Sequence, residues 1–592
     1  MFLSPSVDKA TEEAVPFPPT TVNRGIAAPD LVSKGGDLEI VVVGVGGEWV
    51  GELKIPGRGE GRQENQGEDG ENSHCCKRVI PLPFEATFFR SKRLTDMKIR
   101  PGAVILSLFL GGLPAGALQT QPNVLFIVVD DLNDWVGCLG GHPLVKTPHI
   151  DALAQRGVVF TNAHCQAPLC NPSRTSVFLG KRPETTGVYG LQPWFRDVPE
   201  LRELISLPQY FSRNGYRTLA TGKVFHGRFG FRKGDREFDL TGPGYDDGPY
   251  PEERLAKLPG RQNRGNDWGV IEGRNEERGD WKVASWAVER LKSLPPEPVF
   301  LSVGIRLPHV PLFATREWFD LYPDDESVLP FIRRDDREDT PLFSWYLHWR
   351  LPEHRREFLE RARQWQGQVR AYLACISFLD AQVGRVLGAL RAAELEENTV
   401  VVLWSDHGWH LGEKGVTGKN TLWEESTRVP LIFAGPGVTP GLSNATPVEL
   451  LDIYPTLLDL CGLPARDDAL DGISLRAMLE PGGVSRVRPA RTTAGPGNQA
   501  VRGERFRFIR YADGSEEFYD LSEDPHEWVN LVEREELAPV IENYRKWISR
   551  TFAPPVRGSA GRVLEWKGGR PIWEGREIPA GAPIPGLERG DR

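Results

Sequence analysis

The chain has 592 residues, of which 40% are hydrophobic and 26% are charged. This composition provides enough apolar sequence for one large globular domain and a smaller one. The formal net charge of −9 argues against a general nucleic-acid-binding protein, because such proteins carry a basic surface. It does not exclude a local basic pocket for a small anion.

The N-terminal segment differs in character from the rest of the chain. Lys98 and Arg100 precede a short apolar run at 103–113, which small residues follow at a cleavage position. This pattern predicts a signal peptide over 97–117, and hence a secreted or periplasmic protein without a stable membrane span. A buried helix or a membrane anchor is the alternative. We interpret residues 1–96 as a non-native or disordered extension from a start codon placed too far upstream.

The middle of the chain alternates between two kinds of apolar pattern. A continuous β-branched run at 124–129 predicts a buried parallel strand, and similar runs follow at 299–305, 399–405 and 429–435. Helical patterns lie between them, the longest at 357–393. This alternation predicts an α/β fold, in which helices sandwich a large, mostly parallel sheet. We assign this catalytic domain to residues 122–480.

The pattern changes near residue 480. Two short strands of a hairpin are expected at 506–514 and 516–521, followed by a helix over 532–550. Together they predict a smaller α+β domain over 481–552. The tail at 553–592 is rich in Pro and Gly, so we expect it to wrap the surface or to be loose.

Polar residues that could bind a metal follow three of the predicted strands. These residues are Asp130 with Asp131, His309, and Asp406 with His407. In open α/β sheets, ligands bind beyond the carboxyl ends of the strands. Adjacent carboxylates repel each other and resist burial, and a hard cation such as Ca²⁺ or Mg²⁺ relieves both problems. An Asp-Asp pair alone would indicate a solvated turn, but the second acidic strand end favours a metal site.

The segment Cys170-Asn171-Pro172-Ser173-Arg174 carries the most specific pattern, and Pro172 marks where a helix can begin. It resembles the C-x-P-S-R signature of the type I, formylglycine-dependent sulfatases of the alkaline phosphatase superfamily. In that family a maturase oxidises the cysteine to formylglycine, and the hydrated aldehyde supplies the nucleophile that attacks sulfur. A helix N-terminus suits a sulfate ester, because backbone N–H groups and the helix dipole favour anions there.

Further motifs extend the resemblance over roughly residues 122–535. They are VDDLNDWVGCLGG from Val129, GKVFH from Gly222, PHVP from Pro308, SDHGWHLGEKG from Ser405 with Lys419, DIYPTLLDLCGLP from Asp452, DGISL from Asp471, and YADGSEEFYDLSEDPHEWVNL from Tyr511. The G-K-x-F-H and D-H-G-W-x-L-G-E elements look most similar to the iduronate-2-sulfatase-like branch. The resemblance therefore implies hydrolysis of a sulfated carbohydrate.

The resemblance also implies a role for each matched position. One Ca²⁺ ion would be held by Asp130, Asp131, Asp406, His407 and an oxygen of modified Cys170. The Ca²⁺ ion would bind a sulfate oxygen and polarise the nucleophile.

Five further residues complete the implied catalytic set. Arg174 would hold the gem-diol of the hydrated aldehyde in place. Lys223 and Lys419 would neutralise the sulfate oxygens in the transition state. His226 would orient the diol or accept its proton, and His309 would protonate the leaving sugar oxygen, although spacing does not fix which histidine is the acid.

The chain departs from the family pattern at two places. Leu179-Gly180-Lys181 stands where the family usually has Thr-Gly-Arg, within the segment that the maturase reads. Leu307 stands where the iduronate branch commonly has Lys or Arg, with Arg306 one position earlier.

Two other functions remain open at this point. A phosphodiesterase or phosphonate monoester hydrolase of the same superfamily would share the fold, but relatives that hydrolyse phosphate usually have Ser or Thr as nucleophile. A carbohydrate-binding pseudoenzyme would keep Cys170 unmodified. Cys170 in the signature, a single set of cation ligands and the complete set of matched lysines favour a sulfatase.

Overall fold

The computed structural model describes residues 38–43, 49–55, 121–260, 263–466, 468–483 and 488–587. The predicted signal peptide and most of residues 1–96 lie outside these ranges. The chain divides into two units, Met1–Leu108 and Phe109–Arg592. In the first unit, β1 (Leu38–Val43) and β2 (Trp49–Ile55) form an antiparallel hairpin. All other elements belong to the second unit.

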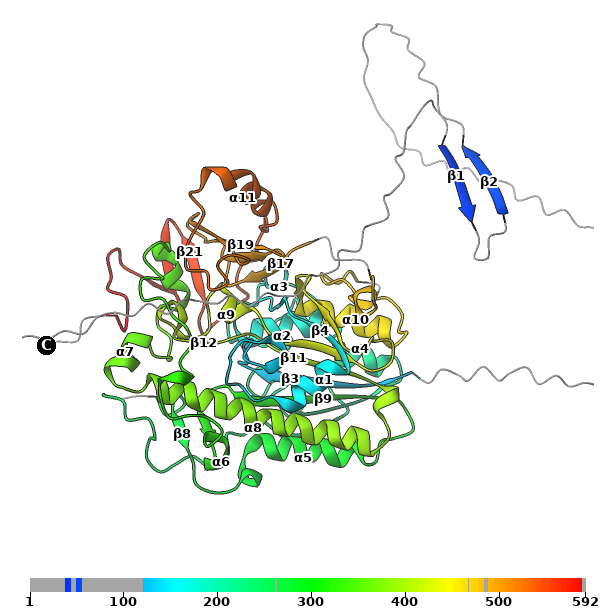
Figure 1. Cartoon of the computed structure of the whole chain (residues 1–592), viewed down its shortest axis with the longest axis horizontal. Coiled ribbons are helices and arrows are strands. Elements are labelled where there is room, and N and C mark those ends of the chain that lie inside the picture. The colour runs from blue at the N-terminus through cyan, green and yellow to red at the C-terminus, as the bar shows by residue number, and fades with distance from the viewer. Residues whose placement is uncertain are drawn as a thin grey trace, which may run out of the picture. The chain divides into compact units, whose positions relative to one another are not determined.

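The second unit is built on an eight-stranded sheet (Figure 1). Its strands in spatial order are β15 (Leu442–Asn444), β4 (Gly157–Phe160), β14 (Leu431–Ala434), β11 (Thr399–Ser405), β3 (Asn123–Asp130), β9 (Val299–Pro308), β6 (Arg217–Gly222) and β7 (Leu240–Gly244). Only β14 among them runs antiparallel to its neighbours. This confirms the predicted mostly parallel sheet.

Helices cover both faces of this sheet, as the α/β prediction requires (Figure 1). One face is covered by α1 (Pro148–Gln155), α5 (Gly279–Leu291) and α8 (Trp365–Ala392). The opposite face is covered by α2 (Cys170–Leu179), α4 (Leu207–Arg213) and α10 (Ile453–Leu460). Alternate side chains of β3 enter the two cores, with Ile127 on the α8 side and Phe126 on the α2 side. Within the described residues, α8 is long and apolar enough to cross a membrane, yet 72% of its most apolar window is buried in the protein.

Several short elements complete the catalytic part. They are α3 (Pro183–Thr186), α6 (Arg316–Phe319), α7 (Arg356–Arg361), α9 (Glu424–Thr427), β5 (Ala163–His164), β8 (Trp268–Val270), β10 (Leu312–Ala314), β12 (His410–Leu411), β13 (Thr417–Gly418) and β16 (Val448–Glu449). The strands pair as β5 with β16, β8 with β10, and β12 with β13. The β12–β13 hairpin follows shortly after β11. Lys419, the residue after β13, contacts Asp131, so the chain stays near the carboxyl ends of β3 and β11.

The C-terminal part holds a four-stranded antiparallel sheet rather than a single hairpin. Its strands are β17 (Ala490–Thr493), β18 (Gln499–Arg502), β19 (Phe506–Arg510) and β20 (Glu516–Asp520). The helix that follows is α11 (Ala538–Arg545), which is shorter than the predicted 532–550. Pro539 in its first turn explains the late start, because proline favours the first positions of a helix.

The Pro/Gly-rich tail is more ordered than its composition indicates. It forms a three-stranded antiparallel sheet of β21 (Leu564–Lys567), β22 (Arg570–Trp573) and β23 (Arg576–Glu577). Leu564, Trp573 and Ile578 are buried against aromatic side chains that include Trp423 and Tyr511. The described part of the tail, residues 553–587, is therefore packed on the protein rather than loose.

Candidate active site

The carboxyl ends of β3 and β11 bring three aspartates together. The two strands pair in parallel with Ser405 opposite Val129, so Asp130 and Asp406 leave the sheet side by side. The backbone N–H of Asp131 donates to Asp406 Oδ1 at 3.2 Å. Asp131 has φ = 62°, an uncommon backbone angle for an aspartate that turns the chain sharply at the strand end. All three carboxylates are fully buried.

Cys170 faces this group from the N-terminus of α2. It is the first residue of the helix and is 1% exposed. Its Sγ lies 3.3 Å from His407 Nε2, 3.2 Å from Lys419 Nζ and 4.0 Å from Lys223 Nζ. Burial raises the pKa of the Cys170 thiol, but the Lys223 and Lys419 cations outweigh burial, and the pKa lies well below its usual range. The position therefore favours a negatively charged nucleophile or substrate.

Arg174, one helical turn after Cys170, holds the aspartates in place. Its Nε donates to Asp406 Oδ2 at 2.8 Å and its Nη2 to Asp130 Oδ1 at 3.0 Å. Its Nη1 donates to the carbonyl oxygens of Lys223 and Val224. These bonds leave one N–H on Nη2 for another acceptor. Arg174 thus directs two N–H groups to carboxylates and two to carbonyl oxygens, and its predicted contact with the gem-diol stays a prediction.

The two adjacent carboxylates at the end of β3 have different pKa values. Burial raises the pKa of Asp131 to about 7, against the effect of Lys419, whose Nζ lies 2.6 Å from Asp131 Oδ1. Burial also acts on Asp130, but its ion pairs with Lys223 and Arg174 help to hold that pKa well below the ordinary value. The negative charge on Asp131 is therefore only partly compensated by the protein.

A metal ion would fit this incompletely compensated group. A carboxylate oxygen from each of Asp130 and Asp131, Cys170 Sγ and a ring nitrogen of His407 all lie within 4.8 Å of one another. Asp131 Oδ2 is buried and accepts no hydrogen bond. A divalent cation would supply the missing charge and the missing contact. Asp406 lies next to this group, but its oxygens already accept bonds from Arg174 and from two backbone N–H groups.

His309 lies on the loop after β9, at the more open side of the site. Its side chain is 21% exposed, and its Nε2 is 3.9 Å from Asp131 Oδ2. Asp280, at the start of α5, accepts backbone N–H bonds from Arg306 at 2.8 Å and Leu307 at 2.9 Å, and so fixes this loop. Sequence analysis missed Asp280, because no motif marks it.

His226 and Arg306 are placed differently from the other matched residues. Within the described residues no hydrogen bond or ion pair joins His226 to Cys170, and its Nδ1 is buried without a hydrogen-bond partner. Arg306 donates to the carbonyl oxygens of His309 and Val310 and pairs with Asp247 at 2.7 Å. Arg306 therefore stabilises the turn that follows β9.

Two aromatic residues that sequence analysis missed support the site. The Tyr372 hydroxyl, from α8, donates to the Asp131 carbonyl at 2.7 Å and accepts from the Asn133 N–H at 3.1 Å. The Trp409 ring lies 5.5 Å from Lys419 Nζ. In the sequence Tyr372 resembles an ordinary core residue, so only its contacts identify it, whereas Trp409 lies within the SDHGWHLGEKG motif, in which no role was predicted for it.

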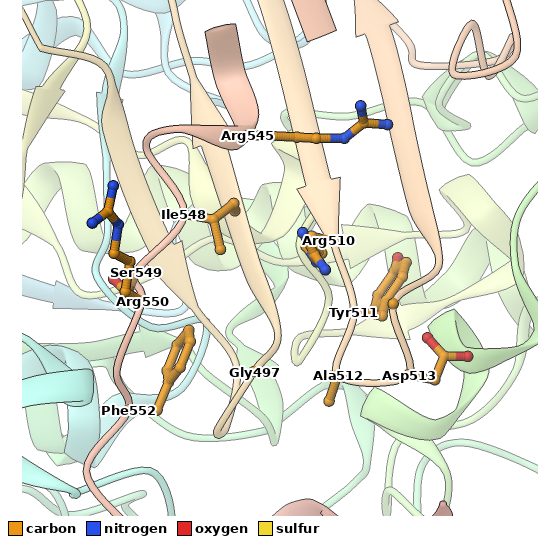
Figure 2. A pocket seen from close by; sticks show the side chains of 11 residues that line it. Gly497, Arg510, Tyr511, Ala512, Asp513, Arg545, Ile548, Ser549, Arg550 and Phe552 are labelled. Carbon is orange, nitrogen blue, oxygen red and sulfur yellow. The ribbon is translucent and has the colours of Figure 1, made fainter. Parts of the chain in front are cut away.

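A separate hollow of about 560 Å³ lies on the C-terminal sheet (Figure 2). Arg510, Arg545 and Arg550 line it, and none of the predicted site residues does. Arg545 is paired with Glu516 at 2.6 Å, whereas Arg550 makes no ion pair among the described residues. This hollow is therefore distinct from the group around Cys170.

Comparisons with known proteins agree with this geometry. The model of the Sulfatase family matches residues 122–463, and that of the N-sulphoglucosamine sulphohydrolase C-terminal region matches residues 412–552. A sulfatase of Formosa agariphila is 40% identical over 73% of this chain and 87% of its own length. Human iduronate 2-sulfatase is 32% identical over 58% of this chain and 69% of its own length.

A solved structure of a 2-O GAG sulfatase has the same fold. It superposes with a TM-score of 0.58 and 24% identity, over 72% of this chain and 90% of that one. The family match covers more than half of the chain, including the ends of β3 and β11, the start of α2 and both lysines around Cys170. This chain therefore belongs to the sulfatase family of the alkaline phosphatase superfamily, whose members hydrolyse sulfate esters, and its buried Asp, Cys and His cluster is the metal-binding site.

Proposed function

We propose that this sulfatase removes sulfate from a carbohydrate, with a formylglycine made from Cys170 and one Ca²⁺ ion. The observation that supports this proposal is the position of Cys170 Sγ, between Lys223, Lys419 and His407 at a helix N-terminus. Two similar proteins, iduronate 2-sulfatase and a 2-O GAG sulfatase, support a sugar ester as substrate.

The donor set supports a hard cation once Cys170 is oxidised. Calcium prefers oxygen ligands, whereas a thiolate is a soft ligand. An oxygen at position 170 would join Asp130, Asp131, Asp406 and His407 in holding Ca²⁺. The bound ion would polarise a sulfate oxygen.

Each residue of the site would then have a separate role in hydrolysis. One oxygen of the hydrated aldehyde at 170, in its deprotonated form, would attack sulfur, and the bond from sulfur to the sugar oxygen would break. His309, whose side chain is 21% exposed, would give that sugar oxygen its proton. Lys223 and Lys419 would stabilise the charge on the sulfate oxygens. Loss of the proton from the second hydroxyl then expels sulfate and restores the aldehyde, and His226 is our proposed acceptor of that proton.

Mass spectrometry and parallel kinetics test the proposal together. The protein is co-expressed with a formylglycine-generating maturase, and the peptide containing Cys170 is weighed. We expect the mass of an aldehyde in place of a thiol, and turnover of sulfated mono- or disaccharides. An unmodified cysteine with carbohydrate binding and no turnover would instead support the pseudoenzyme. Faster turnover of a matched phosphate ester or phosphonate would support the other hydrolase.

We also propose that the chain is exported through a signal peptide at 97–117. The support is the pattern of Lys98 and Arg100, the apolar run and the small residues after it. N-terminal analysis of the native protein tests this. A mature N-terminus shortly after residue 117 is expected, and peptides from residues 1–96 would contradict it.

A further inference from the structure

Tyr245 lies next to Lys223 because two neighbouring strands end side by side. β7 is the edge strand of the eight-stranded sheet and pairs in parallel with β6, with Gly244 opposite Gly222. The next residues, Tyr245 and Lys223, therefore leave the sheet together at its carboxyl edge, where ligands of such sheets bind. Lys223 Nζ lies 5.9 Å from the centre of the Tyr245 ring and 4.0 Å from Cys170 Sγ.

The Tyr245 ring also lies near the turn that carries His309. The central carbon of the Arg306 guanidinium is 5.7 Å from the ring centre, and Arg306 donates to the His309 carbonyl oxygen at 3.2 Å. His309 is our proposed donor of the proton to the leaving sugar oxygen, and its side chain is 21% exposed. Tyr245 is thus close both to a lysine that would bind the sulfate and to the residues on the side of the leaving group.

The backbone that carries Tyr245 is fixed on the protein by the two residues that follow it. Asp247 Oδ1 pairs with Arg306 Nε at 2.7 Å. A Cβ at Gly279 would lie 1.7 Å from the Asp246 carbonyl oxygen, so the start of α5 and this loop are in direct backbone contact. A fixed backbone lowers the entropy that is lost when a side chain on it binds a ligand.

The protein itself makes little use of the Tyr245 side chain. Within the part of the chain that the structure describes, its hydroxyl makes no hydrogen bond, and the side chain is partly exposed. The ring belongs to none of the hydrophobic clusters of the described residues. Tyr250, in the same loop, differs in both respects, because its hydroxyl donates to Asp247 at 2.6 Å and its ring packs edge-on against Phe313. Tyr245 therefore has a free hydrogen-bonding group and apolar surface at the edge of the site.

We infer that Tyr245 positions the sugar of the substrate, with its hydroxyl bonded to a sugar hydroxyl and its ring packed against the carbon skeleton of that sugar. This inference rests on the proposed function. A tyrosine suits a sugar, because it offers apolar surface and a hydrogen-bonding group while it loses little conformational entropy. The substrate class narrows to sulfate esters whose leaving group carries a free hydroxyl near the ester.

Kinetics on matched substrates test this inference. Each enzyme, with Cys170 modified, is assayed on a sulfated sugar, on its single deoxy analogues, and on an aryl sulfate whose ring carries no free hydroxyl. For Tyr245→Phe we expect kcat/KM on the sugar to fall about 3- to 10-fold, as the loss of one hydrogen bond predicts, and to stay unchanged on the aryl sulfate. The wild type should lose as much on one deoxy analogue, on which the variant loses nothing further. Tyr245→Ala, which also lacks the ring, should lose about 10- to 100-fold on the sugar.

Two controls separate sugar recognition from an indirect effect on Lys223. Inorganic sulfate, which would contact Lys223 but has no sugar, should inhibit the wild type and Tyr245→Phe equally. Tyr250→Phe removes a hydroxyl that is already bonded to Asp247, so it should leave the ratio of sugar to aryl turnover unchanged. Equal losses of Tyr245→Phe on the sugar and the aryl sulfate, or no loss on the sugar, would overturn the inference. A modified wild type that cleaves the aryl sulfate but no sulfated sugar would overturn the carbohydrate part of the proposed function, and this inference with it.

Discussion

The catalytic cluster of Asp130, Asp131, Cys170 and His407 differs in its arrangement from a second buried group of charges. The other, the bridging cluster, consists of Glu424, Arg502, Arg507 and Glu527 and joins α9 to the C-terminal sheet. In the bridging cluster, carboxylates and guanidinium groups pair directly. Arg507 Nε lies 2.7 Å from Glu527 Oε1, and Arg502 Nε lies 3.2 Å from Glu424 Oε1.

The catalytic cluster points its charges at a shared centre instead. Lys419 and His407 both approach Cys170 Sγ, and Asp131 Oδ2 is left without a hydrogen-bond partner. Paired buried charges hold a structure together, whereas charged groups that converge on one atom are suited to bind a ligand. Burial and charge alone therefore do not identify a site; the direction of the charged groups does.

Removing the nucleophile should give the largest effect. For Cys170→Ala we expect kcat on an aryl sulfate to fall at least about 10⁴-fold, because the methyl group of alanine cannot form the covalent intermediate. The melting temperature should change little, since the side chain is small. Appreciable turnover by this variant would exclude Cys170 as the nucleophile.

Removing a carboxylate from the catalytic cluster should lower both the amount of bound metal and the activity. Asp130→Asn keeps the shape of the side chain but takes away a negative charge near Arg174 and Lys223. We expect bound calcium to be lost and kcat to fall about 10³-fold or more. Calcium content by atomic emission and the rate are measured on the same sample, before and after chelation. Full calcium content with full activity would remove Asp130 from the metal site.

Breaking the bridging cluster should affect stability alone. Arg507→Met leaves Glu424 and Glu527 buried without their main partner, which should lower the free energy of unfolding by about 3–5 kcal/mol. Urea denaturation measures this change. Calcium content and kcat per folded molecule should match the wild type, since Arg507 contacts none of the catalytic cluster among the described residues. A loss of calcium without a loss of stability would contradict our division into two clusters.

Substitution of Asp280, which accepts hydrogen bonds from the end of β9 next to His309, should have a smaller effect on stability. Burial raises the pKa of Asp280 from 3.8 to about 6, despite the N–H bonds from Arg306 and Leu307. Between these values the folded protein holds the proton more tightly than the unfolded chain. The contribution of Asp280 to stability is therefore present at low pH and is lost as the pH rises through about 6, by at most about 3 kcal/mol.

Asp280→Asn, which cannot titrate, should lack this part of the pH dependence. Urea denaturation of both proteins between about pH 4 and about pH 7 measures the difference. The unfolding free energy of the wild type should decline more steeply with rising pH than that of the variant. Parallel curves would show that Asp280 has an ordinary pKa in the folded state.

The large sheet could be predicted because its pattern is local. The apolar run at 124–129 is buried on both faces, and burial on both faces demands continuous apolar sequence. The C-terminal sheet was only half predicted, since β17 and β18 are short and carry polar residues such as Arg491 and Gln499. Their pairing depends on neighbours that are distant in the sequence. The choice between a tail that wraps the surface and a loose one stayed open, because its few buried anchors, Leu564 and Trp573, stand among turn-forming residues.

From sequence alone one could place an acidic pair at one strand end, Asp406 and His407 at another, and Cys170 at a helix start. These are local facts of residue order and periodicity. Only the tertiary structure decided that Arg174 holds the carboxylates, that Asp280 and Tyr372 support the site, and that Tyr245 lies beside Lys223. The physical reason is that a hydrogen bond or ion pair depends on distance and direction in space, and residues tens to hundreds of positions apart leave no local sequence pattern that predicts their contact.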